Sequence, residues 1–304
     1  MKKSKKQKFY FISFLFIIFS AFLISDAIAV KLKKTIAVSR FENRTSWSGQ
    51  YRLDDGMTDQ LTDALIQSGN FVVLERQTLG DVIAEQDLAA SGRMAKAKAA
   101  TTGKIVPSQI LIKGAITEFE SKSAGSGSGI SFGGFSIGSK KSEAHVGIIL
   151  RLINTTTGEV LDSVRVEGKA KGGGLKFGAK VGGFGFGTDG FNKTPLGKAT
   201  QMVIDNAVVE ISEKLNHIPF SGKIIKITGD TIYINAGSRN GVSGGDTFNV
   251  FSVGEELIDP DSGESLGSES TKVGSLKVNS VQEKFSKGAK ISGGSFKKGF
   301  SISQ

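Results

Sequence analysis

An alternation of short apolar segments with helix-periodic segments in residues 35–114 limits what this chain can fold into. Thr35–Phe41 and Phe71–Leu74 have the length and composition of buried strands. Between them, apolar residues recur every four positions, which is the spacing of one helix face. These residues are Leu53, Met57, Leu61 and Leu65. A strand, a helix and a second strand in that order predict a sheet with helices packed against it.

The same pattern continues to residue 218. We expect a second helix from Leu79, a strand at 108–114, and a hairpin of strands 146–153 and 159–166. Thr194-Pro195 can start a long helix. Its expected apolar face is Leu196, Ala199, Met202, Val203, Ala207, Val208, Ile211 and Leu215. Together these elements predict an α/β or α+β domain with a central mixed sheet flanked by helices.

The last part of the chain, residues 219–304, has a different composition. Short alternating strands follow one another, separated by Gly, Asp and Asn turns. The expected strands are 224–227, 231–234, 247–251, 274–278 and 289–291. Regular short strands predict a small antiparallel barrel or sandwich. We therefore expect two domains, residues 30–218 and 219–304, divided near Pro219.

Residues 1–29 have the three parts of a secretory signal peptide. Five lysines precede an apolar run at Phe9–Ile24, and Ala27-Ile28-Ala29 follows as a small-x-small cleavage site. An uncleaved membrane anchor is the alternative, because about 16 apolar residues approach the ~20 that span a bilayer. We expect cleavage before Val30 and export to the periplasmic space bounded by the outer membrane, or to the outer membrane itself.

The composition excludes several kinds of site. The chain has no cysteine, so it can form neither a disulfide nor a thiolate metal site, and it cannot be a lipoprotein acylated on cysteine. Its two histidines, His145 and His217, lie in no metal motif or catalytic arrangement. We expect no metal, no cofactor and no enzymatic activity. The net charge of +10 falls to +6 without the five lysines and Asp26 of the leader, and export argues against nucleic acid as a partner.

Two glycine-rich stretches, residues 121–141 and 169–190, flank the predicted strand pair. In the second, apolar residues alternate with Lys176, Gly178, Lys180 and Gly182, as in a strand with one face in lipid and one in water. Lys176 and Lys180 would then face a lumen. The lipid-facing residues would be Ile130, Phe132, Leu175, Phe177, Ala179 and Val181. The alternative is a pair of solvated surface loops.

The order of these elements resembles the curli secretion channel (CsgG-like) family. The resemblance is carried by Thr58–Leu61, Asp63–Leu65, Phe71–Gln77, Val82–Glu85, Ile112–Ile116, Val146–Ile153, Thr156–Val160 and Ser163-Val164. It implies a homo-oligomeric ring in the outer membrane, to which each subunit contributes two β-hairpins. The two glycine-rich stretches occupy the positions of those hairpins. The resemblance also implies a secreted polypeptide as cargo and periplasmic accessory proteins as partners.

The resemblance also places a constriction in the loop between the first strand and the first helix. The corresponding segment here is Arg44–Leu53, with Trp47 and Tyr51 as its aromatic residues. Alternatively, these two side chains pack the loop onto the domain.

At the other end of the chain, Asn240–Asp246 and Asp259–Gly267 resemble the C-terminal domain of FlgT-like flagellar periplasmic proteins. Two functions therefore compete: a secretion channel for an extracellular polypeptide, and a soluble periplasmic scaffold or ring component.

Overall fold

A computed structural model gives the structure of the protein. It describes residues 32–47, 52–95, 99–124, 130–132, 135–137, 139–175, 189–263 and 265–304. The predicted leader, residues 1–29, lies outside this range. Among the residues described, no helix combines the length and apolar character needed to cross a bilayer.

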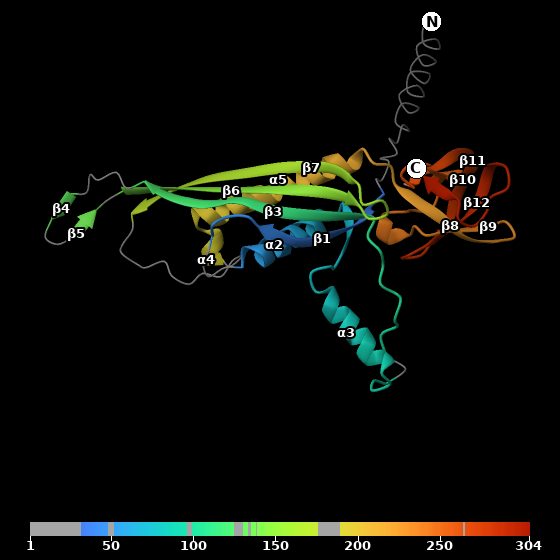
Figure 1. The fold of residues 1–304 in the computed structure, drawn as a ribbon, viewed down its shortest axis with the longest axis horizontal. Helices are drawn as coiled ribbons and strands as arrows, with labels where there is room; N and C mark the ends of the chain where they lie inside the picture. Colours follow the sequence, from blue (N-terminus) through green and yellow to red (C-terminus); the bar gives the residue numbers. More distant parts are fainter. Residues whose placement is uncertain are drawn as a thin grey trace, which may run out of the picture. The chain divides into compact units, whose positions relative to one another are not determined.

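A mixed five-stranded sheet, in the order β2-β1-β3-β6-β7, forms the first part of the chain (Figure 1). Strand β1 pairs in parallel with β2 and β3, whereas β3, β6 and β7 pair antiparallel. The strands are β1 (Lys34–Asn43), β2 (Phe71–Leu74), β3 (Ile110–Ala124), β6 (Ser139–Asn154) and β7 (Val160–Leu175). The predicted central mixed sheet is confirmed.

Helix α2 (Leu53–Ser68) presents the predicted apolar face to this sheet. Leu53, Met57, Leu61 and Leu65 are each at most 1% exposed. The helix ends at Gly69, whose left-handed backbone (φ 67°) is the conformation that terminates many helices. The next helix, α3 (Leu79–Ala90), contains no buried residue.

Helix α5 (Pro195–Asn216) follows the short helix α4 (Asp189–Asn192). It begins as predicted, because the Thr194 hydroxyl accepts a 3.0 Å hydrogen bond from the Gly197 amide. The predicted apolar face is wrong at one residue, because Met202 is 46% exposed. Thr200 is buried instead, and its hydroxyl donates to the Leu196 carbonyl at 2.8 Å, so the buried polar atom is satisfied.

Helices α2 and α5 cover one face of the sheet. In β6, Ala144, Val146, Ile148, Leu150 and Leu152 are fully buried in one cluster with residues of both helices. The residues between them are partly exposed, with the exception of Gly147, and in β7 buried and exposed residues also alternate. The opposite face of β6 and β7 is therefore the more open one, and it carries most of the charged residues of these strands, together with Ile149 and Ile153 of β6.

The C-terminal strands close into a six-stranded antiparallel barrel in the order β10-β11-β12-β9-β8-β13. The strands are β8 (Ser221–Thr228), β9 (Thr231–Ile234), β10 (Thr247–Ile258), β11 (Ser265–Val281), β12 (Ser286–Gly293) and β13 (Ser301–Ser303). A short 3-10 helix, η2 (Ser238–Asn240), connects β9 to β10. The predicted antiparallel β-structure is confirmed, although β13 was not predicted and both β10 and β11 are longer than expected.

Leu32, near the start of the described chain, packs in the core of this barrel and is 4% exposed. Two hydrogen bonds fix the adjacent residue. The Lys33 amide donates to the Asn240 carbonyl at 2.7 Å, and the Asn240 side-chain amide donates to the Lys33 carbonyl at 3.1 Å. The barrel core therefore takes one residue from the segment that leads into β1.

Helix α2 offers a matched pair of substitutions that tests the one-sided core. Leu61→Ala removes a fully buried side chain, and we expect it to lower the free energy of unfolding by about 2–5 kcal/mol. Ile66→Ala lies on the same helix but is 56% exposed, so its effect should stay within about 0.5 kcal/mol. Urea unfolding followed by circular dichroism measures both. Equal losses for the two variants would contradict the assignment of the buried face.

Candidate functional site

The strand ladder continues past the ends predicted from the sequence and into the glycine-rich stretches. The β3–β6 pairing runs to Ala124 opposite Lys141, and the β6–β7 pairing runs to Ser139 opposite Leu175. Residues 169–175 of the second stretch are therefore strand rather than the start of a separate hairpin. The strands continue through their glycine residues, because the backbone groups of these residues form hydrogen bonds with the backbone of the neighbouring strand.

The first stretch contains a further pair of short strands, β4 (Ile130–Phe132) and β5 (Phe135–Ile137). Ile130 lies opposite Ile137, and Phe132 lies opposite Phe135. The backbones of Ile130, Phe132 and Leu175 are thus placed in strands. The remaining residues predicted to face lipid or a lumen lie outside the described residues. These are Lys176, Phe177, Ala179, Lys180 and Val181.

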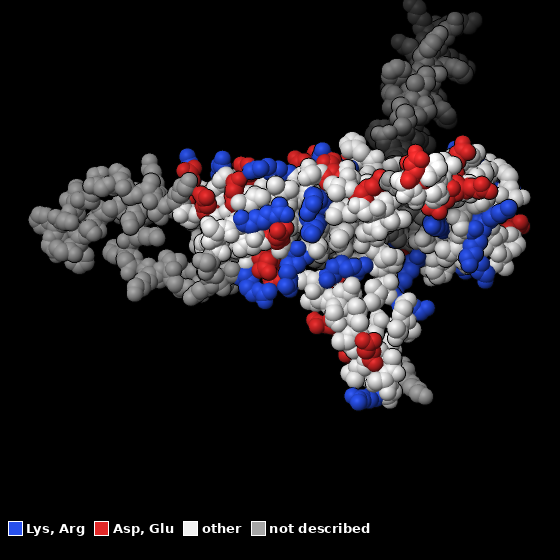
Figure 2. All heavy atoms as spheres, in the orientation of Figure 1, with Lys and Arg blue, Asp and Glu red and all other residues white. Residues whose placement is uncertain are grey.

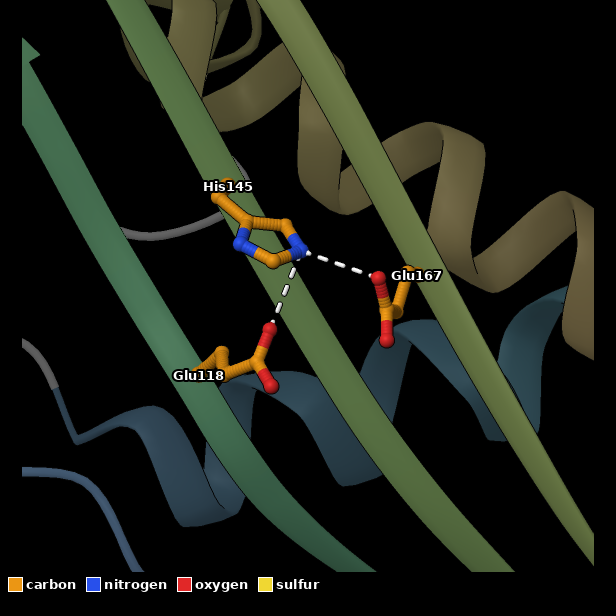
Figure 3. Close-up of side chains that lie close together, drawn as sticks. All are labelled: Glu118, His145 and Glu167. Atoms are coloured by element: carbon orange, nitrogen blue, oxygen red, sulfur yellow. Dashed lines mark hydrogen bonds and ion pairs between the residues drawn. The ribbon is translucent and has the colours of Figure 1, made fainter.

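Three titratable side chains meet on the polar face of the sheet: Glu118 of β3, His145 of β6 and Glu167 of β7 (Figure 3). The imidazole Nε2 lies 3.0 Å from a carboxylate oxygen of Glu118 and 3.3 Å from one of Glu167. The sequence alone indicates no partner for His145. The structure shows that it joins three adjacent strands.

Gly147 makes this arrangement fit. It pairs with Glu118 on one side and with Glu167 on the other, so its position lies between the two carboxylates. A Cβ atom at Gly147 would lie 3.1 Å from the Glu118 carboxylate oxygen and 3.2 Å from the Thr117 hydroxyl. The missing side chain leaves room for His145, two residues away on the same strand, to reach both carboxylates.

Arg165 completes the cluster through the other oxygen of each carboxylate. It lies 2.8 Å from Glu118 and 3.1 Å from Glu167. The Arg165 hydrogen bond lowers the pKa of Glu167 below its usual 4.5, and the hydrogen bond from His145 adds to this effect. Because Glu118 and His145 are only 27% and 29% exposed, solvent screens these contacts less than ordinary surface pairs.

Glu118, His145 and Glu167 could each offer one ligand atom to a cation, since these atoms lie within 4.8 Å of one another. Zinc ordinarily takes four ligands, and the three offered here lie beside the positive charge of Arg165. We interpret the cluster as a cross-strand ion-pair network. It ties β3, β6 and β7 together where the ladder extends toward the glycine-rich stretches.

The loop between β1 and α2 is held at both of its ends by one carboxylate. Arg40 of β1 lies 2.8 Å from Asp55, and Arg52, just before the helix, also lies 2.8 Å from Asp55. Trp47 is partly buried and meets Phe119 edge to face, with ring centroids 5.1 Å apart. This is the packing expected if the loop lies on the domain. Tyr51 is outside the described residues, and the constriction stays a prediction.

The pKa of Glu167 gives the cluster a testable pH dependence. A carboxyl group whose pKa is lowered in the folded state stabilises the fold above its unfolded pKa, and this stabilisation is lost as the pH falls through the folded pKa. Arg165→Gln removes the main cause of the lowering. We expect its melting temperature to fall less steeply than that of the wild type between about pH 5 and pH 3.

Lys171→Gln is the matched control. It removes one positive charge from the same face of β7, where the Lys171 Nζ lies 3.9 Å from a carboxylate oxygen of Glu143. Its pH profile should follow the wild type when melting is monitored by circular dichroism. Parallel profiles for Arg165→Gln and the wild type would contradict the role given to Arg165.

Comparison with protein families gives two matches. The model of the curli production assembly/transport component CsgG matches residues 20–220. The model of the C-terminal domain of flagellar assembly protein T matches residues 229–296. By these descriptions both families are transport or assembly components. No curated protein matches the chain.

Several solved structures are similar to part of this chain at low identity. A hypothetical protein from Chlamydia trachomatis is 12% identical, with 60% of this chain and 98% of that chain covered and a TM-score of 0.38. The PelC dodecamer from Paraburkholderia phytofirmans is 13% identical, with coverage of 58% and 86% and a TM-score of 0.28. A lipoprotein from Neisseria meningitidis is 15% identical, with coverage of 59% and 99% and a TM-score of 0.28.

Proposed function

Since the chain belongs to the family of the curli production assembly/transport component CsgG, we propose that it is one subunit of a homo-oligomeric outer-membrane ring that exports an extracellular polypeptide. The family match covers the whole five-stranded sheet and both helices that pack on it. Export of the subunit itself would use the predicted leader at residues 1–29.

The observation that carries this proposal is the continuation of three adjacent strands into the glycine-rich stretches. In β3, β6 and β7, pairing extends from the helix-covered core to residues 124, 139 and 175. A β-structure can enter lipid only when all its backbone groups are paired, and a shared barrel satisfies this requirement. The paired ladder supplies a base from which residues 125–138 and 176–188 could contribute strands to such a barrel.

Transport through this ring would be passive. A water-filled lumen passes an extended chain, and a narrow ring of loops sets the width of the passage. We place that constriction at the loop between β1 and α2, because Asp55 fixes both ends of the loop through Arg40 and Arg52. Lys176 and Lys180 would line the membrane portion of the lumen and make it attractive to anions.

A periplasmic scaffold is the second function, and a specific observation favours it. Residues 229–296 match the C-terminal domain of a flagellar assembly protein, and these residues form most of a closed barrel. A domain of this kind would dock the subunit to other envelope components. In that case the glycine-rich stretches would be solvated loops.

Two neighbouring substitutions separate the functions. If Phe177 faces lipid, Phe177→Arg should cost about 2–4 kcal/mol per subunit near mid-membrane and prevent insertion. Lys176→Glu, one residue away on the opposite strand face, should leave insertion intact and shift the ion selectivity toward cations. Insertion into liposomes and single-channel conductance measure both effects.

In the scaffold alternative both positions are solvated, where substitutions usually change stability by less than about 0.5 kcal/mol. Equal behaviour of Phe177→Arg and the wild type, or the absence of conductance from the wild type, would contradict the channel. A strictly monomeric sedimentation profile in mild detergent would contradict the ring in either function.

A further inference from the structure

The C-terminal part of the chain carries its charges in two separate groups. Residues 252–271 contain six acidic residues and no lysine or arginine. The acidic residues are Glu255, Glu256, Asp259, Asp261, Glu264 and Glu269. The rest of 219–304 contains ten basic and three acidic residues. In the space-filling view, red and blue side chains of this part gather on different sides (Figure 2).

The acidic residues that the structure describes belong to an arm that leaves the barrel, which we define as residues 252–263 and 265–271 of β10, β11 and the turn between them. Pairing of β10 with β13 stops at Phe251, and pairing of β11 with β12 starts at Gly274. Beyond those points the two strands pair only with each other, from Ser252 opposite Thr271 to Ile258 opposite Ser265. A two-stranded ribbon without a covered face is marginally stable alone.

The arm exposes apolar side chains that the barrel does not cover. Val253, Leu257, Ile258 and Leu266 are between 49% and 64% exposed. At its tip, Asp259 accepts hydrogen bonds from the amides of Asp261 at 2.8 Å and Ser262 at 3.2 Å. These two hydrogen bonds define the shape of the turn at the tip. The arm thus offers a surface that is both apolar and anionic.

A surface of the complementary kind lies on the outside of the barrel. Lys226 of β8 and Lys287 of β12 both pair in register with Tyr233 of the intervening strand β9. Each lysine Nζ lies 5.6 Å from the centre of the Tyr233 ring, and the Phe285 ring lies 6.3 Å from it. We call Lys226, Tyr233 and Lys287 the lysine–tyrosine row.

A bulge adds an apolar residue to this row. The β8–β9 register shifts between Ile224 and Lys226, so the bulge leaves Ile225 and Lys226 exposed side by side on consecutive positions. Ile225 is 40% exposed. The row therefore offers apolar and aromatic surface flanked by two cations, which matches the composition of the arm.

The base of the arm and the row lie at opposite ends of the barrel strands. In the closed order β10-β11-β12-β9-β8-β13, β9 is three strands away from β10 in either direction. Strand β12 pairs with β11 from Gly274 opposite Gly293, at the base of the arm, to Val281 opposite Ser286, and Lys287 lies at this second end. The row is therefore remote from the base of the arm in the same copy, and a second copy can bring the two surfaces together.

We propose that the arm of one copy binds the lysine–tyrosine row of the next copy. The contact joins two different surfaces, so it repeats head to tail and closes into a ring when the rotation between copies allows it. Opposite charges steer the encounter and fix its register, and the exposed apolar residues of both surfaces become covered. The inference rests on the oligomer of the proposed function but does not depend on the glycine-rich stretches.

The absence of cysteine makes a direct test available. Full-length chains carrying only Leu257→Cys in the arm are mixed with differently tagged chains carrying only Ile225→Cys beside the row, and the mixture is oxidised without membranes. We expect a disulfide-linked pair of the two tags. Its yield should fall several-fold at 1 M salt, where the screening length is only about 3 Å. Val209→Cys, 55% exposed on α5, replaces Ile225→Cys as the control.

Charge reversal tests the chemistry of the contact. Lys226→Glu with Lys287→Glu in the Ile225→Cys chain should abolish the cross-link, and Glu255→Lys with Glu269→Lys in the Leu257→Cys chain should restore it. Lys297→Glu with Lys298→Glu, which reverses two exposed lysines elsewhere on the barrel, should leave the yield unchanged. Circular dichroism melting confirms that each variant is folded.

Equal cross-linking of Leu257→Cys to the Ile225→Cys and Val209→Cys chains would overturn the proposal. A cross-linking yield that is the same with and without the lysine reversals would also overturn it. In that case, binding of the chain to vesicles of anionic lipid that depends on Lys226 and Lys287 would assign the row to a membrane surface. Because no membrane is present, loss of channel activity with an intact cross-link would count against the proposed function alone.

Discussion

Burial of β6 and β7 on one face only is the constraint on which the first part of the structure depends. Helices α2 and α5 cover the buried apolar residues of β6 and β7, so the charged residues between them lie on the other face and pair across the strands. A glycine on each face of the sheet allows a close contact there. A Cβ at Gly168 would lie 2.4 Å from the Ala199 carbonyl, so this glycine permits the close approach of α5. Gly147 makes room on the polar face for His145.

The same constraint explains which parts of this fold could be predicted. Helix α2 was predicted from Leu53, Met57, Leu61 and Leu65, which recur every four positions and are all buried. The face of α5 was predicted apart from Met202, which lies just beyond the buried arc, whereas Thr200 lies within it. The ion-pair cluster was not predicted. Glu118 and Arg165 are 47 residues apart, and only the strand register brings them together. The alternating charges of β7 were the available signal.

In the C-terminal barrel, the sequence pattern predicts the central strands but neither the closure of the barrel nor the full length of β10 and β11. Its apolar strands were predicted from their alternation, but closure depends on β13, a strand of three residues that is too short to carry a pattern. The length of the two strands that form the arm was not predicted, for a different reason. Its glycine and serine residues are typical of loops, yet the two segments pair with each other along most of their length. Cross-strand backbone pairing, rather than local propensity, decides the structure there.

The seating of Leu32 in the barrel core bears on the order in which this chain can fold. The Lys33 carbonyl accepts a hydrogen bond from Asn240, 207 residues later in the sequence. The barrel is therefore completed only after nearly the whole chain is available. Closing so long a loop is slow and entropically costly. A chain that crosses a membrane from its N-terminus would expose Leu32 first and bury it near the end. The segment leading into β1 would therefore stay accessible to chaperones until the last strands arrive.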